Sequence, residues 1–290
     1  MDTNYKITTD NTADLPYSFY KENDIDFLFL PYTLEGKQYT LDNELPVGEF
    51  YSRMRDGSMP TTSQYNVNDV CRKWEPYLQK GVDILHIAFS SGLSGSYNSS
   101  RLAAEQLREQ YPERSIIVVD TLSASMGEGM LVWYAANMKK EGKTLKEVAS
   151  WLEENKLHLC HVFSVNDLFH LYRGGRVSKA TAILGTMINI KPMLHVDNEG
   201  HLINLSKVRG RKHSIIRLAD MMDERIGSYR DKNPIMMISH GDCLDEAELL
   251  KQEVLKRYPG TEIWINHVGA TIGAHSGPGT MALFFLGDFR

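Results

Sequence analysis

Short runs of apolar and β-branched residues alternate with longer stretches of helical pattern along the chain, and this alternation constrains the fold most strongly. In the first half, the runs Tyr5–Thr9, Phe27–Tyr32, Ile84–Phe89 and Ser115–Val119 have the length and composition of buried strands. Strands that are separated by helices are typical of α/β proteins, in which neighbouring strands are mainly parallel. We therefore predict an α/β fold with largely parallel sheets.

The second half repeats this alternation, with a predicted hairpin as a local difference. His158–Ser164 and Ile190–Val196 are strand candidates, and the tight turn at 197–200 leads into another, His201–Val208. Helices are then expected over Arg211–Tyr229 and Asp245–Tyr258, and strands over Ile235–Ser239 and Thr261–Asn266. Because 290 residues suffice for two ordinary domains, we predict α/β domains at 1–156 and 157–290, with a ligand site between them.

Two positions carry recognisable signals for the start of a helix. Thr144 and Glu147 have the spacing of a capping box, ahead of a helical run that includes Val148. Asp14, just before Leu15 and Pro16, has the side chain and the position of an N-cap residue. We expect a helix to begin at each of these two sites.

Composition excludes several classes of protein. The chain is 42% hydrophobic and 24% charged, which is typical of a globular protein and not of a disordered one. Its longest apolar runs, such as Met281–Leu286, are far shorter than the ~18 residues that span a bilayer, and the polar start does not resemble a secretory signal. Cys71, Cys160 and Cys243 lack the spacing of a zinc site or a disulfide framework. We expect a cytoplasmic protein with no transmembrane segment, metal or cofactor.

The most informative segment is the Ser/Gly loop, residues 90–99 (SSGLSGSYNS), which follows a predicted strand and precedes a helical run at 101–107. Such a junction directs free backbone N–H groups, and here several hydroxyls, toward one place where a carboxylate or phosphate can be held. The loop lacks the Gly-Lys-Ser/Thr of a P-loop and the GxGxxG of a dinucleotide site. The alternative interpretation is a hydroxyl-rich helix cap.

Ser94 makes a serine esterase or thioesterase the second hypothesis for function. Gly92 stands two residues before it, as in the G-x-S-x-G nucleophile elbow, but Ser96 occupies the position of the second glycine. A serine nucleophile also needs a histidine base, for which His275 is the candidate. The incomplete motif argues against this hypothesis.

Two further segments supply candidate ligand contacts. The Thr-Thr-Ser loop, residues 59–64 (MPTTSQ), places three hydroxyls in a row, although such a run is more typical of a helix N-cap. His275 lies in a glycine-rich stretch, 269–279, whose glycines permit tight turns or close backbone approach. We expect a functional role for His275, with His267 as the competing candidate.

Positive charge is concentrated in one segment of an acidic chain. The net charge is −5, yet residues 173–217 contain nine Lys or Arg and only two Asp or Glu. Arg173 and Arg176 flank a glycine pair, and Lys191 and Arg209 extend the basic segment. Guanidinium groups match the geometry of phosphate or carboxylate, so the segment can face a phosphate or an acidic partner; the alternative is a solvated surface. Because the chain is acidic overall, no nucleic-acid partner is expected.

Taken together, these motifs resemble those of the DegV family. They occur in order over essentially the whole chain, which makes the set more specific than any single motif. The matching segments are TTDNTADLP at 8–16, MPTTSQ at 59–64, SSGLSGSY at 90–97, RGGR at 173–176, IKP at 190–192 and the glycine-rich stretch around His275.

The resemblance implies a two-domain α/β protein that binds a long-chain fatty acid and presents it to an ATP-dependent fatty acid kinase, without catalysis of its own. It implies contacts to the fatty-acid carboxylate from Thr62, Ser63, Ser94 and Gly95, with His275 beside them. Arg173 and Arg176, and with them Lys191 and Arg209, are then expected to face the kinase and its phosphate.

Two residues depart from the family pattern: Asn11 replaces a usual serine, and Thr271 replaces a usual apolar residue. Neither is a proposed carboxylate contact, but Thr271 can alter the surroundings of the headgroup. The acyl tail requires an apolar tunnel, for which Ile183–Ile190 and Met281–Leu286 are candidate walls; the alternative for both is ordinary core. Hydroxyls and helix N-terminal amides are suitable donors for a carboxylate that leaves water, since they need no salt bridge.

Overall fold

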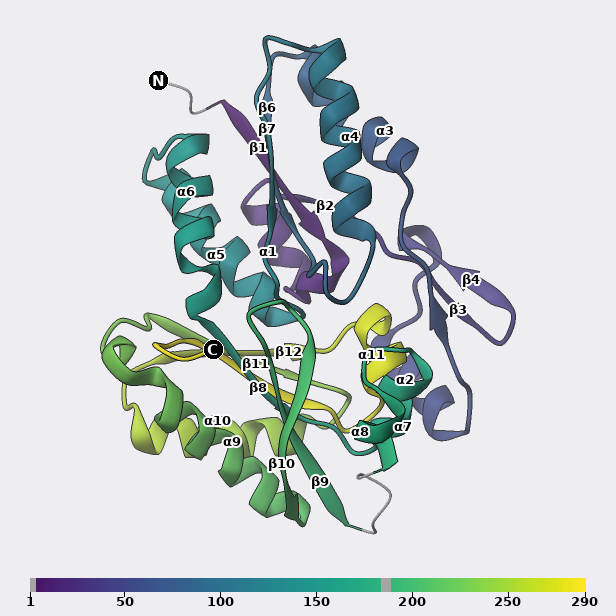
Figure 1. The fold of residues 1–290 in the computed structure, drawn as a ribbon, viewed down its shortest axis with the longest axis vertical. Helices are drawn as coiled ribbons and strands as arrows, with labels where there is room; N and C mark the ends of the chain where they lie inside the picture. The colour runs from purple at the N-terminus through teal and green to yellow at the C-terminus, as the bar shows by residue number, and fades with distance from the viewer. Residues whose placement is uncertain (1–3, 184–188) are drawn as a thin grey trace.

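The computed structural model describes residues 4–183 and 189–290, and its two main sheets lie one beyond the other along the long axis of the molecule (Figure 1). The first sheet has the order β2-β1-β6-β7 and is parallel throughout. Every residue of β1 and β6 is buried, as expected for strands that are covered on both faces. The strands are β1 (Tyr5–Asp10), β2 (Asp26–Leu28), β6 (Asp83–Ala88) and β7 (Ile116–Asp120).

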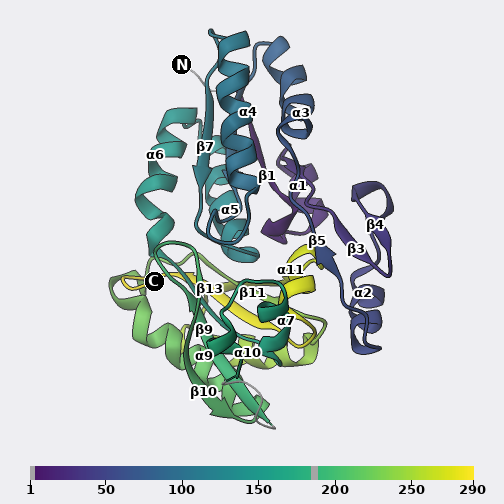
Figure 2. The ribbon, with the colours of Figure 1, turned by 45° about the vertical axis from the view of Figure 1, so that its right-hand side comes forward.

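Helices cover both faces of this first sheet. Figure 2 shows α3 (Val67–Gln79) and α4 (Ser96–Gln110) on one side, and α5 (Met126–Lys140) and α6 (Leu145–Asn155) on the other. The capping box predicted at Thr144 is confirmed at the start of α6, where its hydroxyl accepts a hydrogen bond from the Glu147 N–H. The strand-helix alternation of the N-terminal half therefore follows the prediction.

The helix start predicted at Asp14 is wrong. Helix α1 (Tyr17–Glu22) begins after Pro16, while Asp14 has a left-handed backbone with φ of 51°. Its carboxyl group turns inward and accepts hydrogen bonds from the Ser125 hydroxyl at 2.5 Å and the Gly269 N–H at 3.0 Å. An aspartate can cap a helix or bridge remote segments, and only the tertiary fold selects between these roles.

A small third sheet projects beside the first and carries the Thr-Thr-Ser loop. The predicted strand over Phe27–Tyr32 is divided here into β2 and β3, so that β3 pairs with both β4 and β5. This unit packs on α11 (Ala270–Ser276), and the Tyr51 hydroxyl donates to the Val268 carbonyl at 2.8 Å. Its elements are β3 (Tyr32–Leu34), β4 (Lys37–Tyr39), β5 (Thr61–Thr62) and α2 (Val47–Arg55), with short 3-10 helices η1 (Asn11–Ala13) and η2 (Leu41–Asn43).

The second main sheet is mixed, which corrects the expectation of largely parallel strands for this half. Strands β11 and β12 are parallel, whereas β8–β9, β9–β10, β8–β13 and β11–β13 are antiparallel pairs. A tight turn returns β10 beside β9, and the last strand enters between β8 and β11 in the opposite direction to both. The order β10-β9-β8-β13-β11-β12 comprises β8 (Leu159–Ser164), β9 (Ile190–Val196), β10 (Leu202–Arg209), β11 (Ile235–His240), β12 (Glu262–His267) and β13 (Met281–Leu286).

Helices α9 (Arg211–Ile226) and α10 (Leu244–Arg257) cover one face of the second sheet, and α5 packs against the other. The remaining elements are α7 (Leu168–Arg173), α8 (Lys179–Ile183), η3 (Lys156–His158) and η4 (Gly227–Tyr229). The candidate wall Ile183–Ile190 lies largely outside the described residues. In the described ranges no helix has the length and apolar character that crossing a membrane requires.

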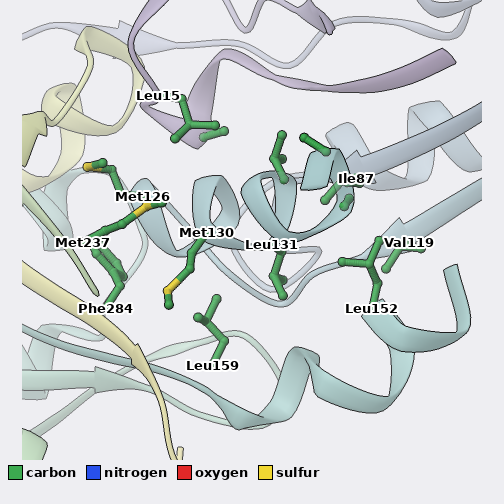
Figure 3. Close-up of a cluster of buried hydrophobic side chains, with 14 of the residues drawn as sticks. Leu15, Ile87, Val119, Met126, Met130, Leu131, Leu152, Leu159, Met237 and Phe284 are labelled. Carbon is green, nitrogen blue, oxygen red and sulfur yellow. The ribbon is translucent and has the colours of Figure 1, made fainter. Parts of the chain in front are cut away.

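One apolar cluster spans the two halves. Figure 3 shows α5 residue Met126 with Met237 and Phe284 of the second sheet at one end of the cluster, and Val119 and Leu152 of the N-terminal half at the other. The α/β class with two sheets is thus confirmed. The chain passes from one sheet to the next between α6 and β8, in the region of the boundary at 156, but the domain limit itself stays a prediction.

Candidate functional site

A cavity of about 250 Å³ lies between the two halves, and both contribute to its wall. Segments that are distant in sequence meet at one end of it: β5, the Ser/Gly loop ahead of α4, the segment after α7, and α11. Figures 1 and 2 both place α11 beside α7, and Figure 2 shows β5 close to α11. The tertiary fold therefore gathers the polar motifs of the sequence around one opening.

All five residues that were predicted to contact a carboxylate line this cavity: Thr62, Ser63, Ser94, Gly95 and His275. Ser63 and Gly95 are exposed, while the other three are half-buried. The polar end is consequently the mouth of the cavity and not its floor. The two loops and His275 are brought together as expected, whereas their role in holding a carboxylate stays a prediction.

His275 is fixed in the mouth by contacts on both sides of its ring. Its Nε2 lies 2.7 Å from the Thr62 hydroxyl, and a Cβ at Gly174 would overlap its Nδ1. Burial, and to a smaller extent the nearby Arg176 and Arg173, lower the pKa of His275 to about 3. The ring is therefore neutral near pH 7. Residue 174 must be a glycine, because the His275 ring occupies the space that a side chain at residue 174 would need.

The Ser/Gly loop lies at the start of α4, whose N-cap residue is Gly95. The Ser94 hydroxyl accepts from the Ser96 N–H at 3.2 Å and also lines the cavity, while its role as a donor to an anion stays a prediction. The first N–H groups of a helix lack partners within the helix and attract anions. A Cβ at Gly95 would overlap Oε1 of Gln64, which indicates how closely the two polar loops approach.

The Thr-Thr-Ser loop does not cap a helix, which excludes the alternative considered for it. Thr62 belongs to β5 and pairs with Tyr32, and α3 is capped instead by Asn66. A strand holds the Thr62 side chain at a fixed point of the mouth. The backbone of this loop is also tied across the molecule, since the Arg173 guanidinium donates to the Pro60 carbonyl at 2.8 Å.

Arg173 and Arg176 have a structural role that the sequence did not indicate. Arg173 also donates to the Ala274 carbonyl at 2.9 Å, which joins the Thr-Thr-Ser loop to α11. Arg176 donates through Nε and a terminal nitrogen to the Leu93 carbonyl, at 3.1 and 2.9 Å, and lines the cavity. We call these two residues the arginine clamp. Their expected orientation toward a kinase stays a prediction.

Asp10 is a second support of the loops that sequence reasoning missed. Its fully buried carboxyl group accepts from the Phe89 N–H at 2.9 Å, just before the Ser/Gly loop, and from the Tyr65 hydroxyl at 2.8 Å, just after the Thr-Thr-Ser loop. Burial raises the pKa of Asp10, and the equally buried Glu128 carboxyl group has its pKa raised by burial and by Asp10. The sequence feature that could have indicated this role is the position of Asp10, an aspartate at the end of a predicted buried strand.

Beyond the mouth the cavity is mainly apolar. Ala282 and Phe284 belong to the run Met281–Leu286 that was predicted to line a tunnel, whereas Met281, Leu283 and Phe285 pack in the core on the other face of β13. Both interpretations of this run therefore hold, on alternate residues. The apolar wall also includes Leu30, Phe89, Leu93, Phe163, Val196 and Leu202.

Of the remaining predicted residues, Thr271 also lines this cavity, whereas Lys191, Arg209 and His267 lie away from it. Lys191 donates to the Asn166 side chain at 2.8 Å, and Arg209 is exposed at the end of β10. His267, the competitor of His275, lines a different cavity. The departures Asn11 and Thr271 contact each other, with Nδ2 of Asn11 donating to the Thr271 hydroxyl at 2.9 Å.

The geometry does not support the serine hydrolase hypothesis, which requires His275 to act as a base on the Ser94 hydroxyl. Within the described residues no hydrogen bond joins Ser94 to His275: Nε2 of the ring pairs with Thr62, and its Nδ1 has no partner. All three cysteines are free. Among residues 4–183 and 189–290, no cluster of three or more His, Cys, Asp or Glu is arranged to hold a metal ion.

Comparison with known proteins places this geometry in a family. The family model described as "Uncharacterised protein, DegV family" matches residues 4–288. The DegV domain-containing protein CPE0026 of Clostridium perfringens is 45% identical over 288 residues, which cover 99% of this chain and 98% of that protein.

Two solved structures extend the similarity to the fold. A DegV family protein from Thermus thermophilus, described for its fatty acid binding, has a TM-score of 0.87 and 31% identity and covers 98% of this chain and 99% of its own. Hypothetical protein TM841 from Thermotoga maritima, described as revealing a fatty acid binding function, has a TM-score of 0.82 and 32% identity, with the same coverage. The chain belongs to the DegV family.

Proposed function

We propose that this protein binds one long-chain fatty acid, with the carboxylate at the mouth of the 250 Å³ cavity and the tail along its apolar wall. The observation that carries this proposal is the meeting of two hydroxyl loops and a helix N-terminus at one end of a cavity that is otherwise mainly apolar. The fatty acid binding described for the Thermus and Thermotoga proteins supports the same ligand class.

The chemistry of the mouth suits a carboxylate. Thr62, Ser63 and Ser94 offer hydroxyl donors, the first turn of α4 offers N–H groups at Gly95, and neutral His275 pairs with Thr62. Hydrogen-bond donors favour the charged form of a carboxyl group, and the arginine clamp adds positive charge nearby. An ionised headgroup is therefore stabilised without a direct salt bridge.

The tail supplies most of the binding free energy in this proposal. At ~0.8 kcal/mol for each CH₂ group, a tail of about 16 carbons offers on the order of 12 kcal/mol before the costs of association. Aromatic residues Phe89, Phe163 and Phe284 line its path. Specific recognition of the acid is then left to the few polar groups at the mouth.

The exposure of the mouth favours presentation of the acid to another protein. Because Ser63 and Gly95 are exposed, a carboxylate held there stays accessible while its tail is enclosed. We therefore propose that the protein carries the acid without turnover and offers it to an ATP-dependent fatty acid kinase in the cytoplasm. The segment that includes Arg173, Arg176, Lys191 and Arg209 has the charge to face that partner's phosphate.

Denaturing the purified protein, extracting it with organic solvent and recording a mass spectrum tests the proposal. One equivalent of fatty acid is expected, either co-purified or after addition of the acid to delipidated protein. The proposal would be contradicted if no fatty acid co-purifies and if the delipidated protein does not bind added acid. Ser94→Ala and Thr62→Val should each weaken binding about tenfold, whereas Ser91→Ala, in the same loop but outside the cavity wall, should leave it unchanged.

A further inference from the structure

A second cavity, of about 430 Å³, lies where α1, the loop between η2 and α2, and the end of β12 meet. None of the five proposed carboxylate contacts lines it. Its wall contains two carboxyl groups, three aromatic rings and a histidine, and it contains neither lysine nor arginine. This composition is the reverse of that at the first mouth, where hydroxyls and arginines gather.

The aromatic rings form one connected surface in this second cavity. The ring of Phe27 lies 5.8 Å from that of Tyr17 and 5.0 Å from that of Tyr20, measured between centroids. The faces of aromatic rings carry negative potential and attract organic cations, most strongly where water is partly excluded. Three adjacent rings also offer apolar area to a short alkyl chain.

The two carboxyl groups of this wall have no cationic partner among the described residues. Asp14 is 6% exposed and Glu44 is half-buried, and the Tyr17 hydroxyl donates to Glu44. Burial raises the pKa of Asp14 to about 8, and it also raises the pKa of Glu44. A cation within a few ångströms would offset this cost of burying negative charge.

His267 is the other titratable group of the wall besides the two tyrosines. Its Nδ1 is buried and has no hydrogen-bond partner in the described part of the chain. That atom has almost no accessible surface, so the groups that this cavity offers to a protonated amine are the carboxyl oxygens of Glu44 and Asp14 and the aromatic faces.

We propose that the second cavity binds a small aliphatic ammonium ion, with its nitrogen between the carboxyl groups of Glu44 and Asp14 and its alkyl part against Tyr17, Tyr20 and Phe27. The inference is independent of fatty acid binding, because the residues that carry it do not line the first cavity. It assigns an additional ligand class to the protein.

Calorimetric titration with n-butylammonium chloride tests the inference, with n-butanol as the uncharged analogue and sodium chloride to keep ionic strength constant. Saturable binding of butylammonium, at least tenfold stronger than that of butanol, is expected at pH 7. Glu44→Gln should weaken it about tenfold and Tyr17→Leu several-fold. Glu22→Gln, at an exposed acid on α1, should leave it unchanged.

Both test positions tolerate substitution, since Tyr17 is 57% exposed and Glu44 is half-buried, and circular dichroism verifies the fold of each variant. A second readout is proton release: because a cation favours ionised Asp14, the heat of binding at pH 7 should vary with the ionisation enthalpy of the buffer. Equal binding of butylammonium and butanol, or unchanged binding by Glu44→Gln, would overturn the inference.

Discussion

The mouth of the first cavity is held from both halves of the molecule by chemically opposite groups. From the N-terminal half, one fully buried carboxyl group, Asp10, accepts hydrogen bonds from the segments next to both polar loops. From the C-terminal half, the arginine clamp of Arg173 and Arg176 donates to carbonyls of the same loops and is only half-buried.

Because Asp10 and the arginine clamp differ in burial, we expect their substitution to affect different properties, stability for Asp10 and ligand binding for the clamp. When a buried acceptor is removed, its donors are left without a partner in a place that water cannot reach. When a half-buried guanidinium is removed, the carbonyls that it contacted can be solvated by water. Asp10 should therefore matter mainly for the free energy of unfolding, and the arginine clamp mainly for the position of the loops. The predictions below test this contrast.

The largest effect is expected for Asp10→Ala. The Phe89 N–H and the Tyr65 hydroxyl both lose an acceptor in a buried site, although Tyr65 keeps a contact with Ser100 at 2.8 Å. The free energy of unfolding should fall by about 3 kcal/mol, as measured by urea denaturation. Asp10→Asn, which keeps one oxygen acceptor, should lose less; equal losses would show that the hydrogen bonds are not the cause.

A pH dependence of stability is expected from Asp14. Its pKa is raised to about 8 by burial, so between pH 6.5 and pH 8 the folded protein holds a proton that the unfolded chain has lost. The contribution of Asp14 to stability must then decrease as pH rises through this window, by about 2 kcal/mol, and level off above it.

Buried histidines do not interfere in this window. Burial lowers the pKa values of His86 and His275 to about 3, and such groups reduce stability only below pH 6.5. Denaturation curves at several pH values measure the slope. Asp10 and Glu128, whose pKa values are also raised by burial, contribute a slope of the same sign. Asp14→Asn should therefore reduce the slope without abolishing it, and an unchanged slope in that variant would assign the titration to another group.

A smaller and local effect is expected for Gly174→Ala. The added Cβ would overlap Nδ1 of His275 and push the ring from the mouth. Fatty acid affinity should fall about tenfold, as measured by fluorescence competition, while the fold persists. Gly48→Ala is the matched control, because a Cβ at that helical glycine meets no atom within 4 Å; a similar loss there would argue against displacement of His275.

The smallest effect is expected for Arg176→Met, which keeps an unbranched stem but removes the guanidinium group and its bonds to the Leu93 carbonyl. Fatty acid affinity should fall about fivefold, and the free energy of unfolding by no more than about 1 kcal/mol. Arg72→Ala, at an exposed position of α3, should change neither. A loss of stability comparable to that of Asp10→Ala would remove the distinction between the two supports.

Features that depend on local sequence were predictable. The capping box at Thr144, the hairpin turn at 197–200 and strands β1, β6 and β7 of the first sheet follow from side-chain chemistry within a few residues. The loops of Ser94 and Thr62 could be selected as candidates because clustered hydroxyls can hold a carboxylate, although a helix cap was an equally open interpretation of such loops. Their meeting at one mouth was implied by resemblance to a family, not by spacing.

Features that depend on long-range contacts were not predictable. The direction of β13 is set by its neighbours β8 and β11, since the run Met281–Leu286 fits a parallel or an antiparallel position equally well. Arg176 bonds to a carbonyl 83 residues away in the sequence. Because that internal partner could not be foreseen, the charge of Arg176 was interpreted as facing another molecule. Asp14 has the side chain of an N-cap residue, and only the fold directs it toward Ser125 and Gly269.

The central claim is that donors at the mouth hold an ionised fatty-acid headgroup, and the ¹³C resonance of bound [1-¹³C]palmitate reports on that group directly. The account predicts a single bound carboxyl signal that stays ionised at pH values where the free acid is protonated, and that shifts in Ser94→Ala and Thr62→Val. A signal that titrates like that of the free acid, and is identical in both variants and the unaltered protein, would contradict it.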